Sequence, residues 1–420
     1  MTRGRLWFLA LAAALGGFLF GYDTAVINGG EQQIQRVWTL SSVLHGWVMS
    51  SALWGTVIGA VCGGKVCDRL GRKPTLFWVG VFYLVSAVWS GLAAGPYDLM
   101  VARFLGGLGV GASSIAAPVY IAEISPASER GKLGGLFQFN IVLGMVVSQF
   151  VNWAIGTAGL GDATWRWMLG AEAVPALAFT VVTLFMVESP RWLEQVGIGR
   201  RSRSTEDGFN SIVRLRLPTT TNFFSRANLR PMFLAFAVAA FNRLSGINAM
   251  MYFAKRVFEM AGMTASAALG TAAGLSIVLG LGTFAGLILI DRLGRRTLLI
   301  VGSIGCIVAH FSAAAAFLCD LGLLAAACIF IFIVFFAMGQ GVVIWVFISE
   351  IFPQRSRAQG QSWGSFTHWS LCAALTFVFP LMAAKWPTWS IFAFFGVCLV
   401  AHLLWAVFIC PETKGKALDE

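Results

Sequence analysis

Long apolar stretches follow one another along the chain, separated by short segments that carry most of the charge. Each is close to the roughly 20 residues that a helix needs to cross a bilayer. We therefore expect twelve transmembrane helices. They lie near residues 6–28, 43–64, 75–95, 98–122, 133–156, 166–187, 231–254, 266–290, 297–319, 322–349, 359–384 and 389–410.

The apolar stretches favour helices over a transmembrane β-barrel. Barrel strands alternate polar and apolar residues over segments of roughly ten residues, whereas the run Leu323–Met338 is continuously apolar. The expected fold class is an all-α membrane protein, with twelve transmembrane helices in two pseudo-symmetric six-helix bundles.

Composition agrees with a chain surrounded by lipid. Hydrophobic residues make up 58% of the 420 and charged residues only 12%, and the mean hydropathy is +0.77. A soluble chain of this length would need more charge to cover its surface. The lipid bilayer is therefore an expected partner.

The net charge of +11 follows the expected topology. Lys and Arg cluster after the even-numbered stretches, and Met1–Arg5 is also basic. Because cytoplasmic loops carry an excess of Lys and Arg, we expect a multi-pass protein of the cell membrane with both termini in the cytoplasm. This explains the charge without a nucleic-acid partner. Four basic residues break the rule on the other side: Arg36, Lys255, Arg256 and Lys385.

Four motifs occur twice, in the same order, at offsets between 223 and 227 residues. Four pairs at a common spacing indicate a duplication. Both copies start from the cytoplasmic side, so the halves are expected to be parallel repeats about an axis along the membrane normal. One pair is Asp68-Arg69-Leu70-Gly71-Arg72 with Asp291-Arg292-Leu293-Gly294-Arg295; the others begin at Glu123 and Glu350, at Glu188 and Glu412, and at Phe20 and Ser245.

The repeat divides the chain into two bundles and a connection. We expect an N-terminal six-helix bundle at 1–190, a basic cytoplasmic linker at 191–230, a C-terminal six-helix bundle at 231–410 and a short cytoplasmic tail at 411–420. The linker is rich in Arg and has little apolar periodicity, which is typical of short amphipathic or partly disordered segments.

These motifs resemble those of the major facilitator superfamily. Two copies of G-x-x-x-x-D-R-x-G-R-[RK] and the R-x-x-x-G-x-G-x-G motif from Arg103 carry the resemblance. The segments 118–123 (PVYIAE), 188–193 (ESPRWL), 345–353 (WVFISEIFP) and 411–415 (PETKG) resemble its sugar porter branch, which includes bacterial proton/xylose symporters and facilitative glucose transporters. The resemblance implies the major facilitator fold and alternating access, in which two bundles rock about a central site.

The resemblance also implies a cytoplasmic gate. In the family, the motif charges hold the two bundles together on the inside when the site faces outward. Such charge-assisted bonds at a partly dehydrated seam can bias a two-state equilibrium. Basic residues alone would suffice for topology, so paired acids at repeated positions favour a gate. The candidates are Asp68, Arg69, Arg72, Glu123, Arg130, Glu188, Asp291, Arg292, Arg295, Glu350, Arg357 and Glu412.

Asp23 lies in the middle of the first apolar stretch. A carboxylate there costs at least ~2.5–3.5 kcal/mol unless it faces a cavity or a partner. Arg103, near the start of the fourth stretch, is the natural partner. Burial disfavours the ionised carboxyl and a cation favours it, so its protonation can change as a cavity opens and closes. The pair resembles that of proton-coupled members, and facilitative glucose carriers usually have Asn at this position. A structural ion pair without a coupling role is the alternative.

A sugar site needs convergent donors and acceptors and an aromatic face for the ring. The resemblance places Gln138 in the fifth span and Asn248 in the seventh at sugar-binding positions. Tryptophans also anchor helices in lipid, and Trp345, deep in its span, is the better site candidate. The expected substrate-binding set is Phe20, Gln138, Asn242, Arg243, Asn248, Tyr252, Trp345, His368 and Trp369.

The C-terminal half departs from the family pattern. Asn242 and Arg243 stand where two consecutive glutamines are common, and Leu279 and His368 each stand where Asn is common. A polyol or a sugar acid, moved by symport or uniport, therefore remains an alternative to a neutral monosaccharide moved with a proton. Arg243 has three interpretations: it binds a substrate carboxylate, pairs with Asp23, or extends to the outer surface. His368 either titrates or packs.

The sequence shows no nucleophile–base pair, phosphate-binding loop or metal-ligand spacing, so we expect no enzyme, no cofactor and no metal. A transporter-like sensor that binds sugar without moving it would carry long cytoplasmic extensions, whereas this chain ends soon after the motif at Pro411. We therefore expect a carrier, functional as a monomer, whose partners are a small sugar and a proton.

Overall fold

The computed structural model describes residues 3–126, 129–195, 223–353 and 356–414, and this part of the chain is almost entirely helical, with no strand. Eleven of its helices are long and apolar enough to cross a membrane. Lipid offers backbone groups no hydrogen-bond partner, so an apolar stretch can cross it as a helix, which satisfies its own backbone. The prediction of an all-helical membrane protein is confirmed.

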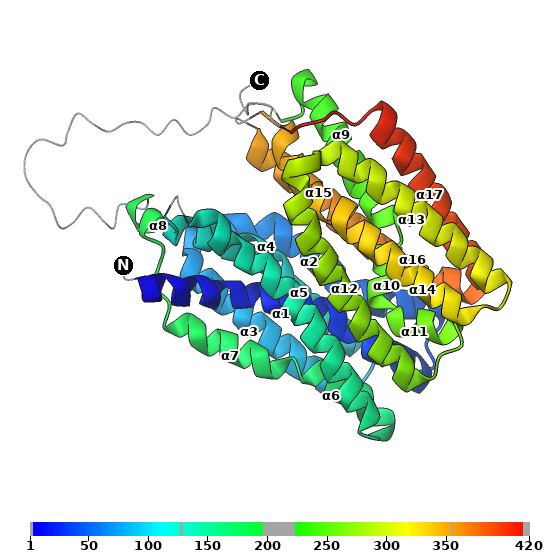
Figure 1. Cartoon of the computed structure of the whole chain (residues 1–420). Helices are drawn as coiled ribbons and strands as arrows, with labels where there is room; N and C mark the ends of the chain where they lie inside the picture. Colours follow the sequence, from blue (N-terminus) through cyan, green and yellow to red (C-terminus); the bar gives the residue numbers. More distant parts are fainter. Residues whose placement is uncertain (1–2, 127–128, 196–222, 354–355, 415–420) are drawn as a thin grey trace, which may run out of the picture.

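The N-terminal part of the chain forms one bundle (Figure 1). Helix α1 lies against α4 and α5, α2 against α4, and α3 against α4 and α7. The sixth apolar stretch is split into α6 and α7. The bounds are α1 Arg3–Val37, α2 Ser42–Leu70, α3 Arg72–Leu92, α4 Pro96–Ile124, α5 Arg130–Thr157, α6 Thr164–Gly170, α7 Ala173–Leu184 and the short α8 Pro190–Gln195.

The C-terminal part forms a second bundle, in which α13 packs against α14 and α17, and α16 packs against α9. Its bounds are α9 Arg226–Leu244, α10 Ile247–Tyr252, α11 Ala254–Met260, α12 Ala265–Leu293, α13 Arg295–Leu318, α14 Gly322–Phe336, α15 Val342–Ile351, α16 Arg357–Lys385 and α17 Thr388–Phe408.

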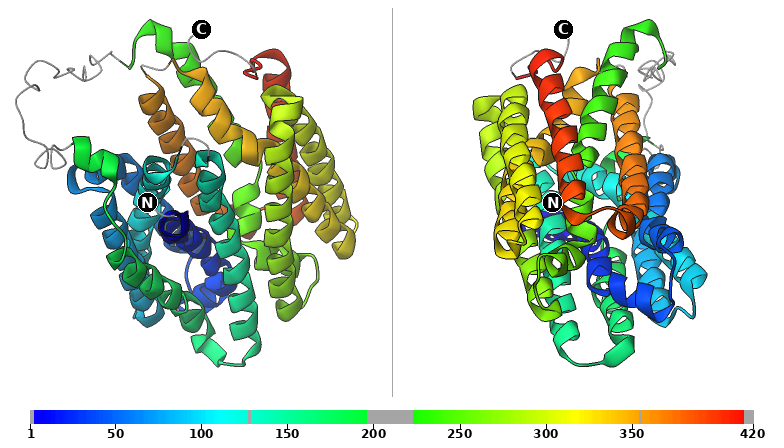
Figure 2. Two further views of the ribbon diagram at one scale, coloured as in Figure 1. Left: turned by 60° about the vertical axis from the view of Figure 1, so that its left-hand side comes forward. Right: turned by 90° about the vertical axis from the view of Figure 1, so that its right-hand side faces the viewer.

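The two bundles lie side by side (Figure 2) and touch through α2 with α16 and α5 with α12. The N-terminus, α8 and the start of α9 lie at one end of the molecule, which we call the linker end. Helix α1 crosses to the opposite end, the distal end, where α2 begins.

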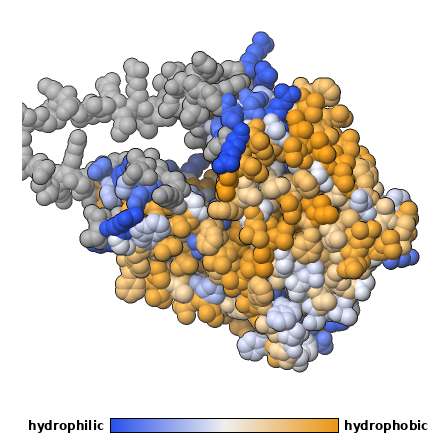
Figure 3. Space-filling model, viewed as in Figure 1, coloured by the Kyte–Doolittle hydropathy of each residue, from blue (hydrophilic) through white to orange (hydrophobic). Residues whose placement is uncertain are grey.

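Apolar residues cover most of the face in Figure 3, and hydrophilic residues gather towards the ends of the helices. Large apolar side chains such as Leu323 and Phe408 are 82% and 78% exposed. A continuous apolar surface of this kind is unfavourable in water, and it fits a protein whose sides face hydrocarbon.

The seventh apolar stretch is not the single span expected over 231–254. It is broken into α9, α10 and α11 at Gly246 and Phe253. Gly246 has a φ of 87°, and a Cβ there would lie 2.8 Å from the Phe395 ring, so glycine is required by both backbone and space. His310 Nε2 lies 2.9 Å from the Ser245 carbonyl oxygen beside the break. Broken helices in membranes persist where neighbours satisfy the freed backbone.

The tenth stretch also departs from a regular helix. A π-helical turn, Ala337–Gly341, separates α14 from α15. Such turns occur often at functional sites. Gln340 in this turn lies buried in the C-terminal bundle.

Candidate functional site

The predicted aromatic residues meet between the two bundles. Phe20 of α1 and Trp369 of α16 have ring centroids 5.6 Å apart, so they join the first half to the second. His368 lies between Trp345 at 4.7 Å and Trp369 at 5.1 Å. These four rings form an aromatic cluster deep in the molecule.

Arg243 lies in the C-terminal bundle beside this cluster and does not pair with Asp23. Its Nη1 donates to Asn248 Oδ1 at 2.5 Å and to Cys372 Sγ at 3.7 Å, and its Nε and Nη2 donate to Asn242 Oδ1 at 3.1 and 2.7 Å. Of the three interpretations of this residue, pairing with Asp23 is therefore wrong in this conformation.

Asn248 and Tyr252, both on α10, are almost completely buried. Asn248 Nδ2 donates to the Cys372 carbonyl oxygen at 3.0 Å and to Thr376 Oγ1 at 3.1 Å, which ties α10 to α16. Tyr252 lies against Thr24 of α1, close to Asp23. The broken seventh stretch therefore brings C-terminal polar groups next to the first helix.

Two other candidates lie outside the aromatic cluster, although Asn242 is hydrogen-bonded to Arg243. Gln138 is exposed on α5 and makes no hydrogen bond among the described residues. Asn242 Nδ2 donates to the Gln340 carbonyl oxygen of the π-helical turn at 3.1 Å. Gln340 Nε2 in turn lies 3.0 Å from His402 Nδ1. The sequence pattern did not indicate this buried polar network, because its members come from widely separated stretches.

A small cavity of about 10 Å³ touches Arg243 and Asn248. It has room for about one water molecule, so this conformation packs closely around the guanidinium. A larger cavity of about 460 Å³ lies elsewhere, between Trp153 of α5 and Gly270 of α12. Its lining is mostly apolar and includes none of the polar candidates, so we do not place the sugar site there.

The expected pairing of Asp23 with Arg103 is present. Arg103 Nη1 donates to Asp23 Oδ1 at 2.5 Å, and its Nη2 donates to the Asp23 carbonyl oxygen at 3.0 Å. Both side chains are 3% exposed. Because water is excluded from this ion pair, each charge depends on the other for compensation, and loss of either partner would leave a buried charge.

A second buried carboxyl, missed in the sequence, lies beside this pair. Glu172 is 1% exposed and interacts with both Asp23 and Arg103. Its Oε1 has no hydrogen-bond partner among the described residues. Asp23 binds the Arg103 guanidinium and Glu172 lies within electrostatic reach of it, so ionisation of both carboxyls would leave one negative charge uncompensated. Glu172 lies in the break between α6 and α7; its isolated acidic character within an apolar stretch was the available signal.

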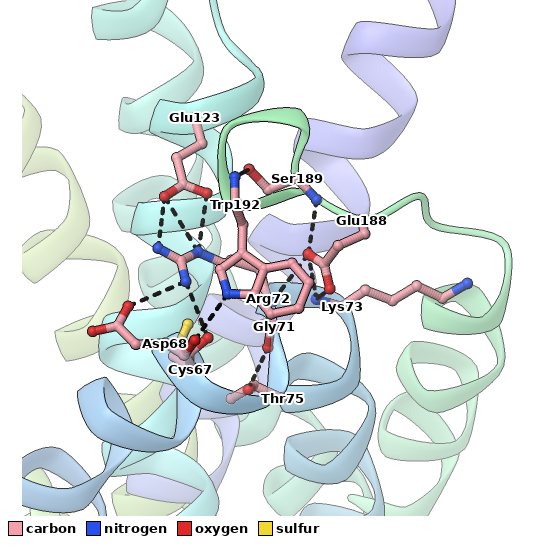
Figure 4. Close-up of polar contacts among 10 residues, drawn as sticks. All are labelled: Cys67, Asp68, Gly71, Arg72, Lys73, Thr75, Glu123, Glu188, Ser189 and Trp192. Atoms are coloured by element: carbon pink, nitrogen blue, oxygen red, sulfur yellow. Dashed lines mark hydrogen bonds and ion pairs between the residues drawn. The ribbon is translucent and has the colours of Figure 1, made fainter. Parts of the chain in front are cut away.

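The linker end of the first half holds the predicted charged motif (Figure 4). Arg72 donates to both oxygens of Glu123, from Nη2 at 2.8 Å and from Nε at 3.0 Å, and from Nη1 to Asp68 at 3.1 Å. Glu188 Oε1 accepts from the backbone N–H groups of Arg72 at 3.0 Å and Lys73 at 3.2 Å. The carboxylate thus sits at the N-terminus of α3, where the helix dipole and free N–H groups favour an anion.

The second half repeats this arrangement. Arg295 donates to Glu350 from Nη2 at 2.8 Å and from Nε at 3.0 Å, and Glu412 accepts from the backbone N–H groups of Arg295 and Arg296, each at 3.0 Å. In both halves a glycine of positive φ precedes the helix: 99° at Gly71 and 89° at Gly294. The duplicated sequence motif is therefore a duplicated structure.

Glu412 lies beyond the last helix, and its ionisation is set by these contacts. Burial opposes the charged form, but hydrogen bonds from backbone N–H groups, those of Lys414 first, outweigh it and lower the pKa of Glu412. The carboxylate is therefore held ionised at the helix end.

The contacts that Arg72 and Arg295 make with Glu123 and Glu350 lie within each half in this conformation. Arg69 and Arg292 are exposed. The side chains of Arg130, Asp291 and Arg357 lie outside the described residues.

Hydrogen bonds between the halves lie at the distal end in the described part of the chain. Arg256 of α11 donates from Nε to Glu31 Oε1 and from Nη2 to Glu31 Oε2, both at 2.9 Å, and also to Gln35 Oε1 at 2.5 Å. The backbone N–H of Lys255 donates to Asn28 Oδ1 at 3.0 Å. His45 Nε2 lies 3.3 Å from Glu31, and both side chains are fully buried. Arg256 and Lys255 were seen in the sequence only as exceptions to the charge rule, and these contacts explain them.

Family comparison matches this chain over residues 9–420 to the model described as "Sugar (and other) transporter". The chain belongs to this family. It is accordingly a membrane transporter and not an enzyme, and the resemblance inferred from the motifs is confirmed.

Curated relatives of known or assigned name align with this chain over nearly its whole length. It is 32% identical over 439 residues to the arabinose-proton symporter of Bacillus subtilis, covering 100% of this chain and 95% of that protein. It is 30% identical over 467 residues to the D-xylose-proton symporter of Escherichia coli, covering 98% and 94%. The inward-open structure of the xylose transporter XylE from E. coli superposes with a TM-score of 0.85 at 30% identity, covering 98% of each chain. The major facilitator fold is therefore confirmed.

Proposed function

We propose that this chain moves a monosaccharide across the cell membrane together with a proton, as a monomer, by alternating access. The observation that carries the proposal is the buried Asp23–Arg103 pair with Glu172 beside it. It lies next to Tyr252, and therefore next to the polar residues between the halves. Relatives named as arabinose-proton and D-xylose-proton symporters support the same function.

The coupling follows from charge. A buried site with two carboxyls and one guanidinium is neutral when it holds one proton, so a change in its surroundings can bind or release that proton. Closing and opening of the nearby sugar site would change these surroundings. Intramembrane ionisable groups are functional by default, which favours coupling over a purely structural pair.

The linker end is the cytoplasmic end in this proposal. The basic segments between the spans collect there, as the charge rule requires. Glu31 and Arg256 join the halves at the distal end, and in this proposal the distal end is the outer side, so the described state would be closed to the outside. When the site faces outward, the charged motifs at the linker end would close the inner side.

The test is a binding and uptake screen on the purified full-length protein. Thermal shift across neutral sugars, polyols and sugar acids identifies ligands, and uptake into proteoliposomes with and without an inward proton gradient tests coupling. We expect a monosaccharide to bind and to accumulate only with the gradient. Binding of no sugar, or accumulation that ignores the gradient, would contradict the proposal.

A further inference from the structure

Arg243 is a membrane-embedded cation without a counter-ion in the described part of the chain. Four other arginines in or beside the spans each bind a carboxylate: Arg72 binds Glu123, Arg103 binds Asp23, Arg256 binds Glu31, and Arg295 binds Glu350. The acceptors around Arg243 are instead the neutral side chains of Asn242, Asn248 and Cys372.

The buried carboxyls of the described residues around the interface between the halves already interact with other cations. Asp23 binds the guanidinium of Arg103, Glu172 interacts electrostatically with both of them, and Glu31 binds Arg256 at the distal end. A guanidinium held only by amides and a thiol keeps its full positive charge in a region of low dielectric constant, which is costly unless an anion joins it. Arg243 is half-buried, so a ligand can reach it when the halves move.

A second group beside Arg243 also lacks a partner. His368 is 3% exposed, and its Nδ1 makes no hydrogen bond among the described residues. It lies close enough to Arg243 to interact electrostatically. A neutral imidazole can carry its proton on Nδ1 and donate it to an oxygen. A buried polar atom without a partner is the exception in folded proteins, and a bound oxygen would satisfy it.

We infer that Arg243 and His368 bind the carboxylate of an acidic monosaccharide, and that the preferred cargo is a hexuronate. This inference rests on the proposed function, because it takes the same central site. Arg243 provides the charge and a planar set of N–H donors that match a carboxylate. Trp345 and Trp369 flank His368 and offer aromatic faces to the ring of the sugar.

The test compares sugars that differ only at C6. Isothermal titration calorimetry on the full-length protein measures D-glucuronate against D-glucose and D-galacturonate against D-galactose, at equal ionic strength, with acetate as a control anion. At least one uronate should bind ten or more times more tightly than its parent hexose and than acetate. Arg243→Gln should abolish this preference, and Arg243→Lys should retain part of it.

Arg166→Gln is the matched control variant. Arg166 is another partly buried arginine without a carboxylate partner in the described residues; it donates to the carbonyl oxygens of Gly91 and Ala93, away from the site. Its replacement should leave the uronate preference intact.

Three results would overturn the inference: the parent hexose binds the wild-type protein as tightly as the uronate, acetate binds as tightly as the uronate, or the preference survives Arg243→Gln. The comparison on the wild-type protein decides the question even where a variant fails to fold. If only neutral sugars bind, the inference fails and the proposed function stands. If neither class of sugar binds, the proposed function fails as well.

Discussion

The Glu31 carboxylate and the Arg256 guanidinium join the two halves of the molecule through two parallel hydrogen bonds of 2.9 Å at the distal end. Glu31 is completely buried, and it comes from the first helix, whereas Arg256 comes from the last segment of the broken seventh stretch. The pair therefore closes one end of the path between the bundles, and it must break when that end opens.

Breaking this pair should favour the conformation open at the distal end. Arg256→Gln leaves the buried Glu31 carboxylate without its guanidinium partner and with only His45 beside it, and removal of one partner of a buried pair costs about 3–5 kcal/mol. Labelling of single cysteines placed near the distal end should therefore increase. The double variant Glu31→Gln/Arg256→Gln should be perturbed less than Arg256→Gln alone.

The control is Glu259→Gln on the same helix. Glu259 pairs with Lys255 at 3.9 Å within α11, and partly exposed pairs of this kind contribute about 0–1 kcal/mol. Distal labelling should be unchanged. Equal labelling in Arg256→Gln and in the wild type would show that the pair does not hold the halves together.

Gly246→Ala should destabilise the protein. The backbone has a φ of 87° there, which costs a residue with a side chain about 1–3 kcal/mol, and the new methyl group would press on the Phe395 ring. The thermal unfolding temperature in detergent, followed by tryptophan fluorescence, should fall.

Gly64→Ala in α2 supplies the comparison, since a Cβ there meets no atom within 4 Å and alanine favours a helix interior. It should leave the unfolding temperature unchanged or slightly raised. If both variants unfold at the same temperature, the break at Gly246 is not under steric constraint.

The sequence located most spans because their apolar runs are long and uninterrupted. The hydropathy pattern did not show that the seventh stretch breaks at Gly246. The break depends on a neighbouring helix, because His310 of α13 binds the Ser245 carbonyl oxygen that the break frees. The pairing of Asp23 with Arg103 was predictable, because a lone carboxylate in lipid requires a cation. Glu172 could be picked out as an isolated acid in an apolar stretch, but its neighbours Asp23 and Arg103, like the Glu31–Arg256 bridge, could not be predicted, because periodicity and motif spacing do not show which helices meet.

Acidification should weaken the contact between the tail and the second half. The pKa of Glu412 is lowered in the folded protein, so its contribution to stability is fully present above the ordinary glutamate value and is lost as the pH falls through the folded value. The unfolding temperature of the wild type should approach that of Glu412→Gln as the pH is lowered from 6 to 3. A constant difference between them across this range would contradict the assignment.

Glu350→Gln should shift the protein towards inward-facing forms, because it removes the negative charge that Arg295 binds and weakens the gate expected at the linker end in the outward-facing state. Glu350 also accepts from Thr413 Oγ1 at 2.6 Å, so the change also loosens the tail. Labelling of the outer cavity should decrease. If it stays the same as in the wild type, Glu350 is not part of a gate.

The most direct test of proton-coupled transport is Asp23→Asn in proteoliposomes loaded with and without a substrate identified by the binding screen. The amide keeps a polar partner for Arg103 and removes the ionisable group. Substrate binding and exchange between loaded vesicles and medium should persist, while accumulation driven by an inward proton gradient should disappear. Gradient-driven accumulation at the wild-type level in Asp23→Asn would contradict proton coupling through this residue.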